Sequence, residues 1–420
     1  MTVSYNIDVI KTTSFSGFLK LQLRWRGSIW KQVITELILF TTAFAVLTVI
    51  YRTNILSEES RRVWDNFSRL FDQRMNYIPL TFMLGFFVTV IVGRWNDIFK
   101  NIGWIDNSAL YVAAFIHIEK ARIIRRNIIR YLVLTQTLIF RDISIQVRKR
   151  FPTMDTLLAT GLMNEEEFEC LNKLGEGPKY WAPILWSYSL LCSAREQGKI
   201  AGDALLNNIL EQIRQFRSGL GRLCNYDWVP VPLVYPQVVF LAVRSYFLLS
   251  LIARQSVMVY PIVPFIMTAL QYIFYVGWMK VAESLMNPLG EDDDDFECNY
   301  LIDRNLKVGL QIVDDAYGVV PRQQQSSVEM LYSAESATKP IFPLAGSVAG
   351  VAVDEIVMIP HVDVNGETES LSDDQVNEDK VKLVAVSKSD NGANDKSGNE
   401  CGIPSHRPSV LEKVKRQFSR

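Results

Sequence analysis

The residues best suited to chemistry in this chain are five consecutive carboxylates, Glu291 through Asp295, within the stretch Asn287–Cys298. Adjacent like charges repel one another unless water solvates them or a cation gathers them. Carboxylate and backbone carbonyl oxygens are the ligands that Ca²⁺ prefers, and Gly290 permits a tight turn before the run. The run is therefore either a solvated acidic loop or a set of calcium ligands, and the rest of the chain decides between them.

Sequence signatures of enzymes are absent. No HExxH, Walker A, GxGxxG or GxSxG pattern occurs, and two of the three histidines lie in the last part of the chain. A formal net charge of −1 disfavours a general nucleic-acid-binding protein. The five cysteines are scattered and form no CxxC pair, which is typical of reduced cytosolic or buried thiols. We therefore expect neither an enzyme nor a nucleic-acid partner.

Four apolar segments are long enough to cross a membrane, because a helical span needs about 20 residues. We predict spans near 34–51, 77–93, 229–253 and 257–280. Basic residues cluster before the first span, between Lys20 and Lys31, and the positive-inside rule places that end in the cytoplasm. An even number of spans returns the chain to the same side. We therefore expect the acidic run and both termini to be cytosolic.

Two features of these spans are candidates for function. Ile78, Phe82, Phe86 and Val90 recur every four residues and would share one face of the second helix. Such a face normally contacts lipid or a neighbouring helix, and the alternative is the wall of a pore with an apolar constriction. Arg244 lies inside the third span, where an arginine is costly unless it faces protein or a water-filled cavity.

The segments outside the spans predict two further regions. Residues 96–228 alternate basic and apolar residues with helical spacing, so we expect a helical cytosolic region there, which residues 281–320 continue. Beyond Val320 the composition shifts to Gln, Ser, Asp, Asn and Lys, and residues 321–420 are predicted to form a largely disordered cytosolic tail. Together the segments predict an all-α membrane protein.

Several stretches, taken together and in order, resemble the bestrophin family. They are LRWRGSIWK (23–31), YIPLTFMLGFFVTVIVGRWND (77–97), VRKRFP (147–152), YDWVPVPLVYPQVV (226–239) and FYVGWMKVAESLMNPLGEDDDDFECNYLIDRN (274–304). The Arg-Phe-Pro triplet at 150–152 is a hallmark of the family, and the match covers residues 1–320. The resemblance implies an animal member. Such a protein would be a homopentamer around one central pore, with four spans and a large helical cytosolic region.

The resemblance also implies roles along the pore. Ile78, Phe82 and Phe86 correspond to three apolar rings that form the neck of the channel. Ala204 corresponds to the lower cytosolic aperture, where relatives often carry a larger aliphatic residue, so this aperture is expected to be wider. Arg244 falls where the family carries an uncharged residue, and the resemblance assigns it no role.

For the acidic run, the resemblance implies a calcium clasp. Asp292 and Asp295 correspond to its side-chain ligands. The backbone carbonyls of Ser284 and Asn287 would add two oxygens, and a carbonyl near Ile10 of the partner subunit would complete the site. The cofactor implied is Ca²⁺.

The function implied is a calcium-activated chloride channel in a membrane, expected to be the plasma membrane, which passes chloride and other monovalent anions and contacts lipid. One alternative is a membrane scaffold that regulates another channel, in which the acidic run docks a partner. A secondary transporter is disfavoured because the four spans show no inverted repeat.

Overall fold

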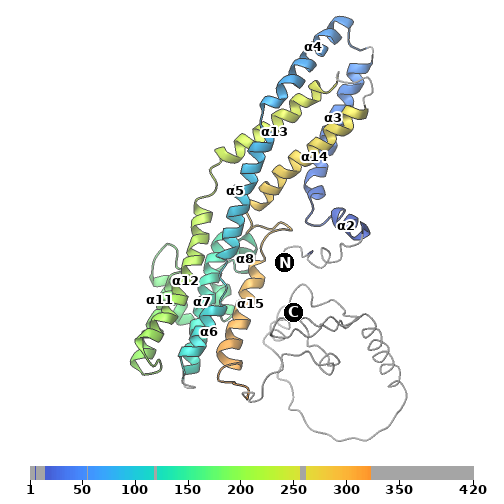
Figure 1. Cartoon of the computed structure of the whole chain (residues 1–420). Helices are drawn as coiled ribbons and strands as arrows, with labels where there is room; N and C mark the ends of the chain where they lie inside the picture. The colour runs from blue at the N-terminus through green and yellow to red at the C-terminus, as the bar shows by residue number, and fades with distance from the viewer. Residues whose placement is uncertain (1–4, 6–14, 54, 118–120, 256–261, 323–420) are drawn as a thin grey trace, which may run out of the picture. The chain divides into compact units, whose positions relative to one another are not determined.

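The structure is a computed structural model that describes residues 5, 15–53, 55–117, 121–255 and 262–322. Every regular element in these ranges is a helix (Figure 1). Four of the helices are long and apolar enough to cross a membrane: α3 (Ile29–Arg52), α5 (Leu80–Lys100), α13 (Val234–Ala253) and α14 (Ile262–Leu285). The predicted all-α membrane fold with four spans is confirmed. Ile10 and most of the tail predicted at 321–420 lie outside the described residues.

The helix bounds differ from the predicted spans because prolines set where helices begin. Helix α5 begins at Leu80, since Pro79 precedes it with a non-helical ψ of 62°. Helix α13 begins at Val234, after Pro230 and Pro232. At its other end α5 continues through polar residues to Lys100, well past the apolar segment that ends at Gly93. An apolar segment therefore marks membrane depth and not the length of the helix.

The four spans share one apolar core. Helix α14 packs along both α3 and α5, and α13 packs along α5 (Figure 1). Aromatic rings fill the centre: the ring of Tyr272 stacks on Phe40 with centroids 4.4 Å apart and meets the edge of Phe247 at 4.8 Å. Helix α4 (Glu58–Arg74), which connects α3 to the short turn η1 (Met75–Tyr77) before α5, packs on α13. The bundle thus holds α5 against two other spans.

A second core lies in the remaining helices. In chain order, and leaving aside the short α2 (Phe15–Gln22), these helices are α6 (Asp106–Phe115), α7 (Arg122–Ile143), α8 (Ile145–Arg150), α9 (Met154–Ala159), α10 (Glu165–Lys173), α11 (Ala182–Glu196), α12 (Asp203–Trp228), α15 (Cys298–Leu310) and the turn η3 (Gln311–Asp315). Helix α7 is the centre of this core, because residues 132–140 are all buried. It packs against α11 on one side and α15 on another.

A buried polar network fixes α15 relative to the end of α5. The side-chain amide of Asn305 donates to the Gly103 carbonyl at 2.7 Å and to Gln136 Oε1 at 2.9 Å. Gln136 in turn donates to the same Gly103 carbonyl at 2.9 Å. Gly103 has a φ of +87°, and an added Cβ would lie 2.9 Å from Leu220 Cδ2, so only glycine fits there. The network therefore holds α15, the helix that follows the acidic loop, against the residues that follow α5.

Candidate functional site

The acidic run forms a compact loop between α14 and α15, over residues 286–297. The backbone N–H of Phe296 donates to the Pro288 carbonyl at 2.8 Å and closes the loop at its base. Within the loop, the Asp292 N–H donates to Asp295 Oδ2 at 2.7 Å, and the Asp295 N–H donates to the Asp292 carbonyl at 3.2 Å. These three bonds fold the five carboxylates into a turn with Asp295 on its inner side.

The five carboxylates fall into two groups, those that pair with a lysine and those that do not. Glu291 pairs with Lys149, and Asp293 pairs with Lys31 through an Nζ–Oδ2 distance of 2.5 Å. Asp292, Asp294 and Asp295 have no ion pair within the described part of the chain. The two side chains expected to bind calcium, Asp292 and Asp295, thus belong to the group that no cationic side chain neutralises.

Asp295 is the most unusual of the five. Its side chain is 4% exposed, and its Oδ1 is buried with no hydrogen-bond partner among the described residues. Burial, together with the charges of Asp292 and Asp294, raises the pKa of Asp295 to about 6, although the hydrogen bond from the Asp292 N–H lowers it. An unpartnered buried carboxylate oxygen is costly, so its presence in a loop of this composition fits a site built for a cation.

The space around Gly290 is a second indication that the loop can hold a cation. A Cβ at this position would lie 2.7 Å from Asp295 Oδ2 and 3.5 Å from the Asn287 carbonyl oxygen. The Asp295 carboxylate and the Asn287 carbonyl therefore lie close to the same point of the loop, and a side chain there would clash with the Asp295 carboxylate in its present position. No three Asp, Glu, His or Cys side chains converge as a metal site in the described ranges. Backbone oxygens must therefore supply much of any calcium shell, as hard-oxygen sites allow.

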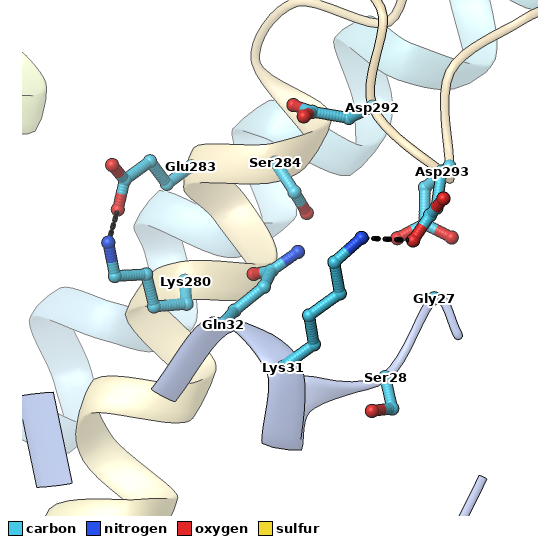
Figure 2. Close-up of a pocket in the computed structure, with 10 residues that line it drawn as sticks. Gly27, Ser28, Lys31, Gln32, Lys280, Glu283, Ser284, Asp292 and Asp293 are labelled. Carbon is cyan, nitrogen blue, oxygen red and sulfur yellow. Dashed lines mark hydrogen bonds and ion pairs between the residues drawn. The ribbon is translucent and has the colours of Figure 1, made fainter. Parts of the chain in front are cut away.

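Ser284 places another oxygen nearby, in the last turn of α14. If the helix continued, its carbonyl would accept from residue 288, but that residue is Pro288, which has no N–H. Carbonyls at a helix C-terminus carry the negative end of the helix dipole, which favours a cation. Ser284 and Asp292 line a hollow of about 280 Å³ with Lys31 and Asp293 (Figure 2). The site therefore combines residues from α3, α14 and the loop.

The predicted neck residues lie on or just before α5. Phe82 and Phe86 are 65% and 58% exposed, and their ring centroids are 4.5 Å apart. Val90 is exposed on the same face. Ile78 differs: it is half-buried in extended backbone before Pro79, so the expected helical stripe of four residues is wrong at that position and begins at Phe82. The role of all three residues in a neck stays a prediction.

Ala204 lies far from the neck. It is exposed in the first turn of α12, and a helix rises 1.5 Å per residue, so it stands about 36 Å from Trp228 at the other end of α12. The position is consistent with a second constriction well below the spans. Its role as an aperture also stays a prediction.

Arg244 has a partner that the sequence reasoning missed. Its guanidinium donates to both carboxylate oxygens of Glu36 in α3, at 2.6 and 2.9 Å. Lys280 of α14 also lies 3.3 Å from Glu36. The arginine is thus part of a partly exposed ion pair that joins α3 to α13. The signal that could have found it is the presence of two opposite charges within predicted spans.

The Arg-Phe-Pro triplet contacts α15, the helix that follows the acidic loop. Arg150 donates to both carboxylate oxygens of Asp303 in α15, at 3.1 and 2.8 Å, and Phe151 is buried in the second core. Because α15 begins directly after the acidic loop, this pairing connects the triplet to the helix that follows the loop.

Comparisons with known proteins agree on one family. Residues 1–315 match the model of a family described as "Bestrophin, RFP-TM, chloride channel". The chain is 56% identical over 388 residues to Bestrophin homolog 15 of Caenorhabditis elegans, covering 86% of this chain and 74% of that protein. It is 45% identical over 428 residues to Bestrophin homolog 22 of the same organism, covering 94% and 84%.

Solved structures show the same fold. A bacterial bestrophin homolog from Klebsiella pneumoniae superposes with a TM-score of 0.53 at 16% identity, covering 67% of this chain and 98% of that one. A mutant of that homolog gives a TM-score of 0.54 at 17% identity, covering 67% and 99%. The family is one of ion channels and not of enzymes, as the sequence predicts. With its Arg-Phe-Pro triplet, four apolar helices long enough to span a membrane and a second helical core, this chain belongs to the bestrophin family.

Proposed function

We propose that this protein is a calcium-activated anion channel that conducts chloride and other monovalent anions. Family membership supports the anion channel. The single observation that supports calcium control is the buried Asp295 oxygen with no partner, held in a loop of five carboxylates. We assign the channel core to residues 1–320 and a cytosolic tail to residues 321–420.

The pore would lie on the axis of a homopentamer. Two phenylalanines exposed on one face of a membrane helix suit a ring of apolar side chains, because five copies of α5 would bring Phe82 and Phe86 around one axis. Ile78 would add a third ring, and Ala204 a wider aperture below. An apolar neck can close by dewetting, and it favours anions that lose water readily. Lipid would cover the outer faces of the spans.

Calcium would be held by oxygens from the loop and from α14. Asp292 and Asp295 would supply carboxylate oxygens, and Ser284 and Asn287 backbone carbonyls, with one more carbonyl near Ile10 of the partner subunit. Bound Ca²⁺ would neutralise carboxylates that otherwise repel one another.

The energy available from such a site is sufficient for gating. A ligand that binds only one state at 100 times its Kd stabilises that state by about 2.7 kcal/mol per site. Moving a two-state equilibrium from 1:99 to 99:1 takes about 5.5 kcal/mol. Two to three occupied sites of a pentamer would therefore supply enough free energy to open the neck.

We further propose that the protein lies in the plasma membrane with both termini and the acidic loop in the cytosol. The basic residues before α3 support this orientation through the positive-inside rule. The purified full chain in liposomes tests the function. Chloride efflux that rises when micromolar Ca²⁺ replaces a chelator supports the proposal. Efflux that is absent at every calcium concentration contradicts the channel, and efflux that does not respond to calcium contradicts its control.

A further inference from the structure

One aromatic side chain joins the acidic loop to α5. Phe296 follows Asp295 directly, is 6% exposed, and points its ring at the cytosolic end of α5. Its centroid lies 5.1 Å from that of Trp95 and 5.4 Å from that of Phe99. Trp95 and Phe99 themselves stack with planes 8° apart. Rings at these separations attract one another beyond the area they bury, so the three form one packed unit.

Phe296 cannot move independently of the proposed ligands. Its backbone N–H closes the loop on the Pro288 carbonyl at 2.8 Å, and Asp295 is its neighbour in the chain. A rearrangement of the loop backbone around a cation would therefore move the peptide that carries the Phe296 ring. Among the loop residues described, Phe296 is the one whose ring contacts α5.

The contact lies on the back of the helix that carries the exposed phenylalanines. Phe82 and Trp95 are 13 positions apart, as are Phe86 and Phe99. At 1.5 Å and 100° per residue, each pair is about 20 Å apart along the axis and about 220° apart around it. The Phe296 ring therefore presses on α5 from the side roughly opposite Phe82 and Phe86. A helix moved at this point carries its exposed face with it.

The ion pairs of the loop are weaker attachments than the Phe296 ring. Glu291 and Asp293 reach Lys149 and Lys31 through ion pairs whose basic side chains are mostly exposed. Exposed ion pairs contribute little and are screened by salt. A buried ring between two others resists displacement more strongly, because packed interiors transmit strain.

We propose that Phe296, held against Trp95 and Phe99, is the positioning residue that transmits the state of the acidic loop to α5. The inference rests on the proposed calcium-activated channel and names the contact that couples its two sites. Coupling of this kind is reciprocal: a ligand at the loop biases the helix only if the helix biases the loop. Loss of the contact should therefore separate calcium binding from opening.

The test compares the full-length chain with Phe296→Leu, which keeps apolar bulk but removes the ring. Two quantities are measured on each reconstituted protein: calcium binding by titration calorimetry, and chloride efflux from liposomes against calcium. In the variant, calcium should still bind. The ratio of efflux at saturating calcium to efflux in chelator should fall by about threefold to tenfold, which is the range expected for loss of an aromatic pair.

Controls separate coupling from damage. Phe140→Leu makes the same change at a fully buried ring of α7, and its calcium response should stay that of the unmodified chain. Trp95→Phe keeps a ring and removes an indole N–H that has no partner among the described residues, so it should retain the response. The exchanged pair Trp95→Phe with Phe296→Trp should also retain it, because two facing rings remain.

Three results would overturn the inference. The first is a Phe296→Leu protein with unchanged binding and an unchanged calcium response. The second is loss of binding together with response, which would make Phe296 a support of the loop alone. The third is an unmodified chain whose efflux ignores calcium. The third removes the proposed calcium control as well, whereas the first two leave it in place.

Discussion

The sharpest local prediction concerns Gly290→Ala, a change of one methyl group in the acidic loop. The added Cβ would lie 2.7 Å from Asp295 Oδ2, whereas ordinary contact begins at 3.4 Å. Asp295 is buried, so its carboxylate has little room to retreat. The carboxylate must therefore leave its present position, and the hydrogen bond it accepts from the Asp292 N–H at 2.7 Å must lengthen or break.

The expected effect is a loss of calcium affinity without loss of fold. Metal–ligand distances in a well-formed site lie within about 0.2 Å of their usual values, and the movement that the Cβ demands is larger than that. Disturbing the groups that orient metal ligands costs about 10- to 100-fold in affinity. At about 1.4 kcal/mol per tenfold change, the corresponding loss is about 1.4–2.8 kcal/mol of binding free energy.

Titration calorimetry on the purified chain measures this loss, and thermal unfolding in the absence of calcium checks the fold. Gly219→Ala is the matched control: its Cβ would meet the Asn101 carbonyl oxygen at 3.5 Å, an ordinary contact, in a helix far from the loop in sequence. A Gly290→Ala protein that binds calcium within about twofold of the unmodified chain would refute the assignment of Asp295 as a ligand.

Alanine at all three predicted neck residues together should give anion efflux without calcium, since the apolar barrier to water is removed; efflux that still needs calcium contradicts the neck. The calcium-free protein should lose stability as pH rises from about 4 to 6. The pKa of Asp295 is raised to about 6 in the folded state, so over this range the folded chain holds a proton on Asp295 that the unfolded chain has already lost. Denaturation midpoints measured against pH should show this decline in the unmodified chain and not in Asp295→Asn. Arg244→Met should lower the thermal midpoint, because Glu36 loses its bidentate partner and is left with Lys280; a midpoint equal to that of the unmodified chain would show that the Arg244–Glu36 pair contributes nothing.

The fold could be read from the sequence to a large extent because length and apolarity determine membrane spans directly. The bounds of the helices are harder to predict from the sequence, since they depend on local backbone conformation. Pro79 disfavours a helical conformation at Ile78, and α5 continues through polar residues to Lys100. Hydropathy indicates which part of a helix lies in the membrane, but it does not indicate where the helix begins and ends.

The candidate site could be predicted in composition but not in arrangement. The run of carboxylates is plain in the sequence, yet nothing in it says that Lys31 neutralises Asp293 while Asp295 turns inward. Contacts between residues far apart in the chain, such as Arg244 with Glu36, follow only from the packing of the helices. The ring of Phe296 against α5 is of the same kind. Family resemblance, not spacing, supplied the division of the five carboxylates into ligands and others.

The most direct test of calcium control is current through the full chain in a planar bilayer with a chloride gradient, recorded as calcium is raised on one side. The unmodified protein should pass a current that reverses at the chloride equilibrium potential and grows with micromolar calcium. The double variant Asp292→Ala with Asp295→Ala should lose the growth while still assembling. A reversal potential that follows the cation gradient, or a double variant with an unchanged calcium titration, would contradict the account.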